Sequence, residues 1–130
     1  MFKRIKYSTG AKWEPIVGYS RAVRIGNTIE VSGTCAIDEH GNPFAPDDAY
    51  AQTRKIFEII TKAIEGLGGT IENVVRTRIY VTNIEEWMDI GKAHGEIFHA
   101  IRPVTTMVEV SKLISPEYKV EIEVTAILNE

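Results

Sequence analysis

Two stretches near the C-terminus decide the fold: Arg102-Pro-Val-Thr-Thr-Met-Val-Glu-Val-Ser-Lys-Leu113 and Lys119-Val-Glu-Ile-Glu-Val-Thr-Ala-Ile-Leu128. Apolar and polar residues alternate in both, and this period of two is typical of strands with one buried face. We therefore expect strands over about 104–110 and 119–127. The second carries Glu121 and Glu123 on its polar face. Because acidic side chains are disfavoured inside strands, these carboxylates need cations, water or a ligand.

The rest of the chain adds shorter strands and two helices. We expect strands over 5–7, 19–25, 28–32 and 74–82, with Gly26-Asn27 as a hairpin turn. Apolar residues at helical spacing after Asp47 and Asp48 predict an amphipathic helix over 48–66, which a glycine-rich run ends. A second helix is expected after the cap residue Asn83, with Pro103 ending it.

This order of elements predicts one α+β domain over residues 1–130, a mixed sheet with two helices packed on one face. The helices would cover the apolar sides of the last strands, which are Val104, Thr106, Val108, Val110 and Val120, Ile122, Val124, Ala126. The opposite face would carry Arg76, Arg78, Tyr80, Thr105, Met107, Glu109, Glu121, Glu123 and Thr125. A monomer does not comfortably expose such a mixed face, so we infer that another subunit covers part of it.

Composition narrows the class of protein. The chain has 130 residues, 44% of them hydrophobic, with a net charge of −3 and a pI near 5.7. This acidic balance argues against a dedicated nucleic-acid binder. No apolar run approaches the roughly 20 residues of a membrane helix, and the N-terminus does not resemble a signal peptide. The single Cys35 excludes an internal disulfide. We therefore predict a soluble, cytoplasmic protein.

The histidines and the cysteine give little sign of metal or nucleophilic chemistry. His40, His94 and His99 form no metal-binding pair, so no zinc site is expected. We expect His94 to pack against the sheet and His40 to lie in a loop. Cys35 has no evident base beside it and is interpreted as a small, partly buried residue.

Two features of the strands carry open alternatives. Gly33, at the end of a strand, lets a ligand approach the backbone or simply bends the chain out of the sheet. Arg76 and Arg78 are expected to pair with the strand carboxylates, across strands or across a subunit interface, and this is our interpretation of Glu123. For Glu121 a binding or catalytic role competes, because a carboxylate in a partly dry cleft can orient water or move a proton.

Six segments, in this order and spacing, carry a family resemblance: Tyr19-Ser-Arg-Ala-Val-Arg-Ile-Gly-Asn27, Val31-Ser-Gly33, Val74-Val-Arg-Thr-Arg-Ile-Tyr-Val81, Arg102-Pro103, Val108-Glu-Val110 and Val120-Glu-Ile-Glu123. Together they resemble the Rid family, also called the YjgF/YER057c/UK114 family, over about residues 19–128. The resemblance implies a chorismate-mutase-like fold and a homotrimer with a small-molecule cleft between each pair of subunits. The best-known members hydrolyse reactive 2-imino acids and enamines without a metal or organic cofactor. Other members carry an endoribonuclease or translation-inhibitor label.

The resemblance also assigns site residues. The cleft tyrosine of the family falls on Tyr19, and the strand-end pair that lines the ligand falls on Ser32 and Gly33. The glutamate that positions water falls on Glu121. An aromatic residue at the start of the second helix falls near Trp87.

Two family residues are replaced. The arginine that grips the substrate carboxylate falls on Thr105, which has one hydroxyl, no charge and a shorter reach. The asparagine of the deaminating members falls on Gly91. Arg102-Pro103 resembles the signature of subgroups that lack the usual arginine.

Three other arginines are alternatives for the missing contact. Arg102 would point away from the Thr105 side of a continuous strand, although Pro103 breaks that regularity. Arg21 and Arg24 are interpreted as surface residues.

These observations predict a trimer whose intersubunit clefts bind a small metabolite and hydrolyse an imine or enamine with altered specificity. Glu121 would orient water, and backbone groups near Gly33 and Thr106 would hold the substrate. The alternative is a metabolite-binding or regulatory module without catalysis. A ribonuclease is disfavoured by the acidic balance and by the lack of a histidine pair.

Overall fold

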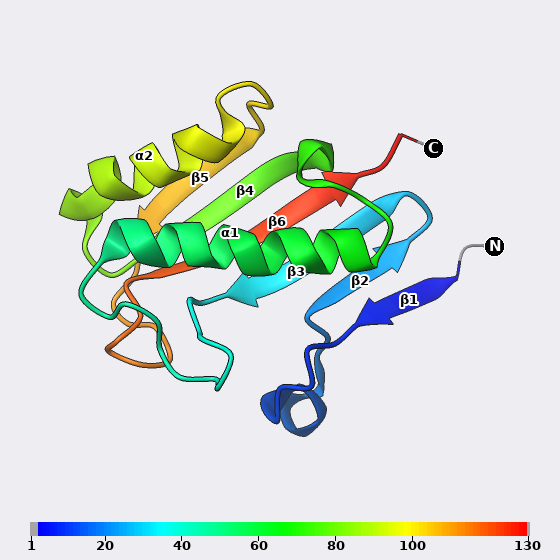
Figure 1. Cartoon of the computed structure of the whole chain (residues 1–130), viewed down its shortest axis with the longest axis horizontal. Coiled ribbons are helices and arrows are strands. Elements are labelled where there is room, and N and C mark those ends of the chain that lie inside the picture. Colours follow the sequence, from blue (N-terminus) through cyan, green and yellow to red (C-terminus); the bar gives the residue numbers. More distant parts are fainter. Residues whose placement is uncertain (1–2, 130) are drawn as a thin grey trace.

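The computed structural model describes residues 3–129 and shows a six-stranded sheet with two helices on one face (Figure 1). The strand order is β1-β2-β3-β6-β4-β5. Only β4 and β5 run parallel among the neighbouring pairs. The strands are β1 Arg4–Tyr7, β2 Ala22–Ile25, β3 Thr28–Thr34, β4 Val74–Val81, β5 Val104–Glu109 and β6 Val120–Ile127. The predicted α+β fold with a mixed sheet is therefore confirmed.

The first helix, α1 (Ala49–Gly66), has both of its predicted ends. Asp48 caps it, because its Oδ1 accepts from the Ala51 backbone N–H at 2.9 Å. At the other end Gly68 has a φ of 93°, and the Gly69 N–H donates to the Ile64 carbonyl at 3.0 Å. This hydrogen-bond pattern is a Schellman motif, which needs a residue without a Cβ at the turn.

The second helix, α2 (Trp87–Phe98), follows a 3-10 turn, η3 (Ile84–Glu86), that Asn83 caps. It ends earlier than expected. The chain leaves the helix between Phe98 and Pro103, where Arg102 has a φ of 53° and donates its N–H to the Phe98 carbonyl at 2.8 Å. A left-handed residue cannot continue a right-handed helix, so Pro103 begins the approach to β5 instead of ending α2.

The core lies between the helices and one face of the sheet. Its largest fully buried side chains include Phe57, Ile56, Ile60 and Ile64 of α1, Phe98 and Ile90 of α2, Ile79 of β4 and Ile122 of β6. The alternation expected along β6 is present, with Val120, Ile122, Val124 and Ala126 buried and the residues between them on the open face. In the hairpin between β2 and β3 only Gly26 uses a positive φ, of 62°.

The face predicted for β5 is wrong. Thr105 and Met107 are register partners of Thr77 and Ile79, which are buried under the helices. Thr105 and Met107 therefore face the helices, and Val104, Thr106 and Val108 lie on the open face. The apolar alternation gave the wrong face because β5 is an edge strand, and its register is set by pairing with β4. The β5 valines, Val104 and Val108, remain 41–56% exposed.

A smaller error concerns β4. Its register against β6 shifts between Val74 and Arg76, so Val75 bulges outward and is 40% exposed. A strict alternation along 74–82 would place Val75 on the buried face with Thr77 and Ile79, but Val74 is buried there instead. Beyond the bulge, Arg76, Arg78 and Tyr80 lie on the open face as predicted. Within residues 3–129 no helix is long and apolar enough to cross a membrane.

Candidate functional site

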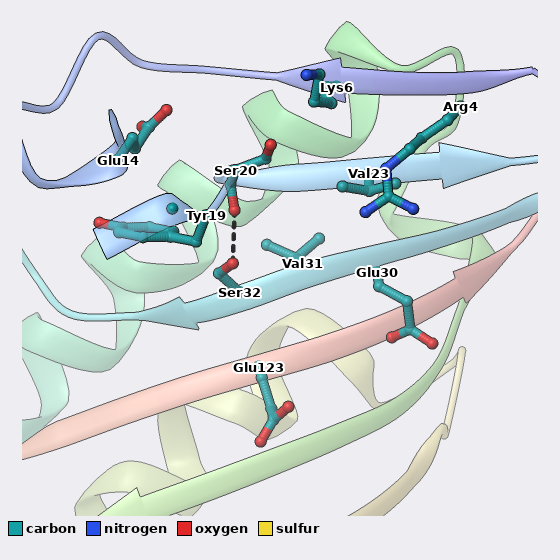
Figure 2. Close-up of a pocket in the computed structure, with 11 residues that line it drawn as sticks. Arg4, Lys6, Glu14, Tyr19, Ser20, Val23, Glu30, Val31, Ser32 and Glu123 are labelled. Atoms are coloured by element: carbon teal, nitrogen blue, oxygen red, sulfur yellow. Dashed lines mark hydrogen bonds between the residues drawn. The ribbon is translucent and has the colours of Figure 1, made fainter. Parts of the chain in front are cut away.

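The open face of the sheet carries a hollow of about 680 Å³ over β1, β2, β3 and the turn η1 (Glu14–Gly18) (Figure 2). Tyr19, Ser20 and Ser32 line one end, and Arg4 and Lys6 of the edge strand line the other. Glu30 and Glu123 stand on its floor. Two of the predicted ligand-binding residues, Tyr19 and Ser32, thus share one concave surface.

Tyr19 is placed by η1. Its backbone N–H donates to the Glu14 carbonyl at 3.0 Å, and the Arg21 guanidinium lies 5.7 Å from its ring centroid. Glu14 is buried, which alone would raise its pKa. Hydrogen bonds from Ser8 at 2.6 Å and from Thr9, with Arg21 nearby, outweigh burial and lower the pKa of Glu14. Glu14 was not predicted as part of the site, although the hydroxyl residues Ser8 and Thr9, a few positions before it, were a usable signal.

Arg21 and Arg24, interpreted from the sequence as surface residues, are half-buried and bind backbone carbonyls. Arg21 Nη2 donates to the Gly33 carbonyl at 2.9 Å, and its Nε is buried without a hydrogen-bond partner in the described structure. Arg24 donates from Nε to the Gly26 carbonyl and from Nη1 to the Leu67 carbonyl, both at 2.8 Å. Both guanidinium groups tie chain turns together, since each carries five donors that backbone carbonyls can use.

Ser32 and Gly33 lie where β3 loses its regular pairing with β6. The register shifts between Val31 and Thr34, which marks a bulge. The Ser32 hydroxyl donates to the Ser20 carbonyl at 2.6 Å (Figure 2), so this hydroxyl holds β2 and β3 together. Gly33 has no Cβ where one would overlap Glu121 Oε2. Close approach to the backbone is therefore what Gly33 permits here, and the group that approaches is the Glu121 carboxylate.

Gly33, Cys35 and Glu121 form what we call the carboxylate cluster. The Cys35 thiol contacts Glu121 Oε1 at 3.7 Å as a weak donor, and Glu121 is half-buried. Burial, together with the charge of Glu121 and this hydrogen bond, raises the pKa of Cys35 to about 12. The thiol is thus protonated at neutral pH and is no nucleophile, in agreement with its interpretation as a small, partly buried residue.

Glu123 has a different partner from the one predicted. Tyr80 donates its hydroxyl hydrogen to Glu123 Oε1, and this hydrogen bond raises the pKa of Tyr80. Arg78 is the register partner of Glu123, yet within the described residues no ion pair joins the β6 carboxylates to Arg76 or Arg78. The ion pair predicted inside the chain is wrong, and a pair across a subunit interface stays a prediction.

The other predicted site residues lie toward the opposite edge of the sheet. Thr105 faces the helices, and its Oγ1 lies 2.8 Å from Thr77 Oγ1. Thr106 is exposed on the open face. Arg102 is exposed and folds back, donating from Nε to the His99 carbonyl at 2.9 Å. Trp87 begins α2 and is 55% exposed.

One chain therefore brings together only half of the predicted site. Tyr19, Ser32, Gly33 and Glu121 gather around β2, β3 and β6. Trp87, Arg102, Thr105 and Thr106 lie with α2 and β5, and β4 separates β5 from β6 (Figure 1).

The histidines lie where the sequence placed them. The His94 ring packs against Phe98, with centroids 4.6 Å apart, and against Phe57 at 5.7 Å. His40 is exposed in a loop. Across residues 3–129 no three His, Cys, Asp or Glu side chains are grouped so that they could hold a metal ion.

Comparison with known proteins identifies the family. The family model described as Endoribonuclease L-PSP matches residues 9–128. The chain belongs to this family, which includes the YjgF/YER057c/UK114 proteins. It is similar to Rv2704 of Mycobacterium tuberculosis, described as a member of the YjgF/YER057c/UK114 family. Identity to that structure is 46% and the TM-score 0.89, covering 97% of this chain and 100% of that one. The fold implied by the resemblance is thereby confirmed.

Two other relatives carry no assigned activity. The structure of PA3499 from Pseudomonas aeruginosa, described as a protein of unknown function, is 30% identical with a TM-score of 0.85, covering 99% of this chain and 95% of that one. The uncharacterized protein SCO2049 of Streptomyces coelicolor is 35% identical over 121 residues, which are 93% of this chain and 90% of the relative. These similarities support the family and the fold, and they assign no reaction.

Proposed function

We propose that the chain forms homotrimers whose intersubunit clefts bind a small metabolite and hydrolyse a reactive imine or enamine to a carbonyl compound and ammonia. The observation that carries this proposal is the carboxylate cluster. A half-buried Glu121 is held against Gly33 and Cys35, beside the hollow lined by Tyr19 and Ser32. A carboxylate held in this way can accept a hydrogen bond from a water molecule and aim it at an electrophilic carbon.

The proposed reaction needs no group other than water and the carboxylate. Glu121 orients the water and accepts its proton as the new C–O bond forms at the imine carbon and the C=N π electrons move to nitrogen. That proton passes from Glu121 to nitrogen and gives a carbinolamine. Glu121 then takes the hydroxyl proton of the carbinolamine and passes it to the amine, so that the C–N bond breaks, the carbonyl forms and neutral ammonia leaves. An imine and one water thus give one carbonyl compound and one ammonia. Backbone groups near Gly33 and Thr106 would hold the substrate during these steps.

Specificity should differ from that of the 2-imino acid hydrolases. Thr105 cannot form the charge-assisted fork that an arginine makes to a carboxylate, and Gly91 has no side chain to offer. A charge-assisted hydrogen bond contributes roughly 1.5–3 kcal/mol, so 2-imino acids should react poorly.

The test is an ammonia-release assay with 2-iminopropionate and 2-iminobutyrate, followed by imines without a carboxylate. We expect slow turnover of the imino acids, loss of turnover in Glu121→Gln, and no change in Glu72→Gln, an exposed glutamate outside the hollow. Rapid turnover of imino acids would refute the altered specificity. Absence of turnover with every imine would refute hydrolysis.

Trimer formation is tested separately by sedimentation at micromolar concentration. The exposed Val104 and Val108 on the open face support an oligomer, because a partner sheet could bury them. A monomer in solution would remove the intersubunit cleft from the proposal.

A binding or regulatory module without catalysis is the second candidate, and Thr105 in place of the arginine favours it. A rise in Tm on adding a metabolite, without ammonia release, would support this candidate.

An endoribonuclease is the third, favoured only by the description of the matching family model. With a net charge of −3 we expect no RNA cleavage. Cleavage abolished by Glu121→Gln in a nuclease-free preparation would reinstate it.

A further inference from the structure

Thr105 is the outer end of a chain of hydrogen-bonding side chains that we call the hydroxyl chain: Thr105, Thr77 and His94. The two threonine Oγ1 atoms are 2.8 Å apart, and Thr77 Oγ1 lies 3.0 Å from His94 Nε2. Thr105 Oγ1 is 3.5 Å from the same nitrogen and 3.3 Å from the Pro103 carbonyl. Thr77 is fully buried and Thr105 is exposed, so the hydroxyl chain runs from the protein interior to the surface.

His94 anchors the inner end of the hydroxyl chain. Its ring packs against Phe57 of α1 and Phe98 of α2. Burial alone lowers the pKa of His94, so the imidazole is neutral at neutral pH. Charged groups on the surrounding elements are turned elsewhere: Arg76 and Arg78 lie on the other face of β4, Arg54 of α1 pairs with Glu96 of α2, and Glu109 of β5 accepts from the Ile84 N–H.

The hydroxyl chain has a direction, because Thr77 owns a single hydroxyl hydrogen. When His94 Nε2 accepts, Thr77 donates to it, and Thr105 in turn donates to Thr77 and leaves its lone pairs for a ligand. When Nε2 carries a hydrogen, as it must in imidazolium, His94 donates to Thr77 and Thr77 donates to Thr105. The hydrogen of Thr105 is then free to reach the Pro103 carbonyl at 3.3 Å or a ligand. The state of His94 therefore decides what Thr105 offers to a ligand.

We propose that Thr105 binds an uncharged polar group of the ligand, such as an amide or a hydroxyl, and that His94 acts through Thr77 as the positioning residue of this contact. An uncharged polar group needs one hydrogen-bond partner. The Thr105 hydroxyl can be that partner as a donor or as an acceptor, depending on the direction of the hydroxyl chain. A carboxylate needs donors and a nearby cation. Arg102, the nearest arginine along the chain, is bound to the His99 carbonyl instead. The inference rests on the proposed ligand cleft and names the class of ligand that it takes.

The test compares binding of 2-oxobutanamide with binding of 2-oxobutyrate, two probes that differ only in amide against carboxylate. We expect the amide to bind more tightly to the wild-type protein in calorimetric titrations. Thr105→Val should weaken amide binding about threefold to tenfold, the effect of one neutral hydrogen bond. Thr28→Val is the matched control, since Thr28 lies in β3, outside both the hollow and the hydroxyl chain, and it should change amide binding little.

A pH series separates this role from a purely structural one. As pH falls through the titration of His94, followed by NMR of its imidazole, the hydrogen that Thr105 no longer donates to Thr77 should strengthen carboxylate binding, because a carboxylate accepts it better than the Pro103 carbonyl at 3.3 Å. Thr77→Val keeps the side-chain shape, breaks the hydroxyl chain and should abolish this response. If Thr77→Val does not fold, the exposed Thr105→Val must abolish it by itself.

Several results would overturn the proposal. These are equal or tighter binding of the carboxylate at neutral pH, unchanged amide binding in Thr105→Val, a pH response that survives Thr77→Val, and binding of neither probe. Each is a binding result. Amide binding without ammonia release from any imine would reject the proposed hydrolysis and leave this inference standing.

Discussion

The carboxylate cluster and the hydroxyl chain differ in how many of their polar contacts are made within one protein chain. Glu121 is enclosed by Gly33 and Cys35 at the middle of the sheet, so its position is set from within the subunit. Thr105 is fixed on its inner side by Thr77 and is open on its outer side, at the edge strand. The carboxylate cluster is thus closed within one chain, whereas the hydroxyl chain is open toward the surface.

The family resemblance predicts an arginine at Thr105. The Thr105 hydroxyl instead joins a connected set of polar atoms that reaches the half-buried His94. A ligand at this position would meet a hydroxyl whose direction can change, and not the fixed positive charge of an arginine. In the proposed function Glu121 thus carries the chemistry and Thr105 the recognition.

The largest expected effect comes from Gly33→Ala. The new Cβ would overlap Glu121 Oε2 and lie 3.1 Å from Cδ, so the carboxylate must move away from Cys35. Because the displaced atoms are the end of a flexible side chain, we expect a stability loss of only about 1 kcal/mol, with loss of imine turnover. Urea unfolding and ammonia release measure the two quantities.

Gly91→Ala is the matched control for this change. Gly91 lies inside α2, and nothing is within 4 Å of the position that its Cβ would take. Alanine should stabilise the helix by about 0.5–1 kcal/mol. Full turnover in Gly33→Ala would show that the position of Glu121 against the backbone is irrelevant to the reaction.

An effect on stability is also expected at the inner end of the hydroxyl chain. Thr77→Val deletes a buried hydroxyl that contacts both His94 and Thr105, and it leaves the His94 Nε2 without its closest partner. We expect a cost of about 1–3 kcal/mol in the free energy of unfolding. The exposed Thr105→Val should cost much less. Equal costs by urea unfolding would mean that burial does not distinguish the two hydroxyls.

These comparisons show which features could be predicted from the sequence. The alternation in β6 correctly placed Glu121 and Glu123 on the open face, because a period of two is a local property of a half-buried strand. The same reasoning failed in β5, where Thr105 takes its face from pairing with Thr77, 28 residues away. The pairing register between two strands that are distant in sequence cannot be predicted from the residue pattern of either strand alone.

The same limit applies to the charged side chains. Arg21 and Arg24 look like ordinary surface residues in a polar strand, yet their partners are carbonyls at Gly33, Gly26 and Leu67. Every residue type has a backbone carbonyl, so the sequence does not show which carbonyls will accept hydrogen bonds from an arginine. Trp87 was predicted from the family resemblance and Thr106 from the proposed mechanism, and a single chain brings neither of them to the carboxylate cluster.

A smaller effect concerns the reactivity of Cys35. With its pKa raised to about 12 by burial first and by Glu121 next, the thiol should react slowly with iodoacetamide at pH 8, because little thiolate is present. Glu121→Gln removes the charge, lowers the pKa and should speed alkylation, although burial keeps the pKa above its ordinary value. Alkylation is measured by mass spectrometry over time. An unchanged rate in Glu121→Gln would separate the thiol from the carboxylate cluster.

The smallest effect should come from the titration of His94. Burial disfavours imidazolium, so the pKa of His94 is lower in the folded protein than in the unfolded chain, where it is about 6.5. Between these two values the unfolded chain binds more protons, and the free energy of unfolding therefore falls as pH is lowered through this window. Above about pH 8 both states are neutral at this residue, and it contributes no pH dependence. His94→Gln should remove this part of the decline in urea unfolding measured from pH 7.5 to 5.5, whereas His40→Gln, at an exposed loop residue, should not. An equal decline in wild type and His94→Gln would show that the inner end of the hydroxyl chain is not a buried neutral imidazole. His94 could then not direct the hydrogen of Thr105. The hydroxyl chain would lose the property that distinguishes it from the carboxylate cluster.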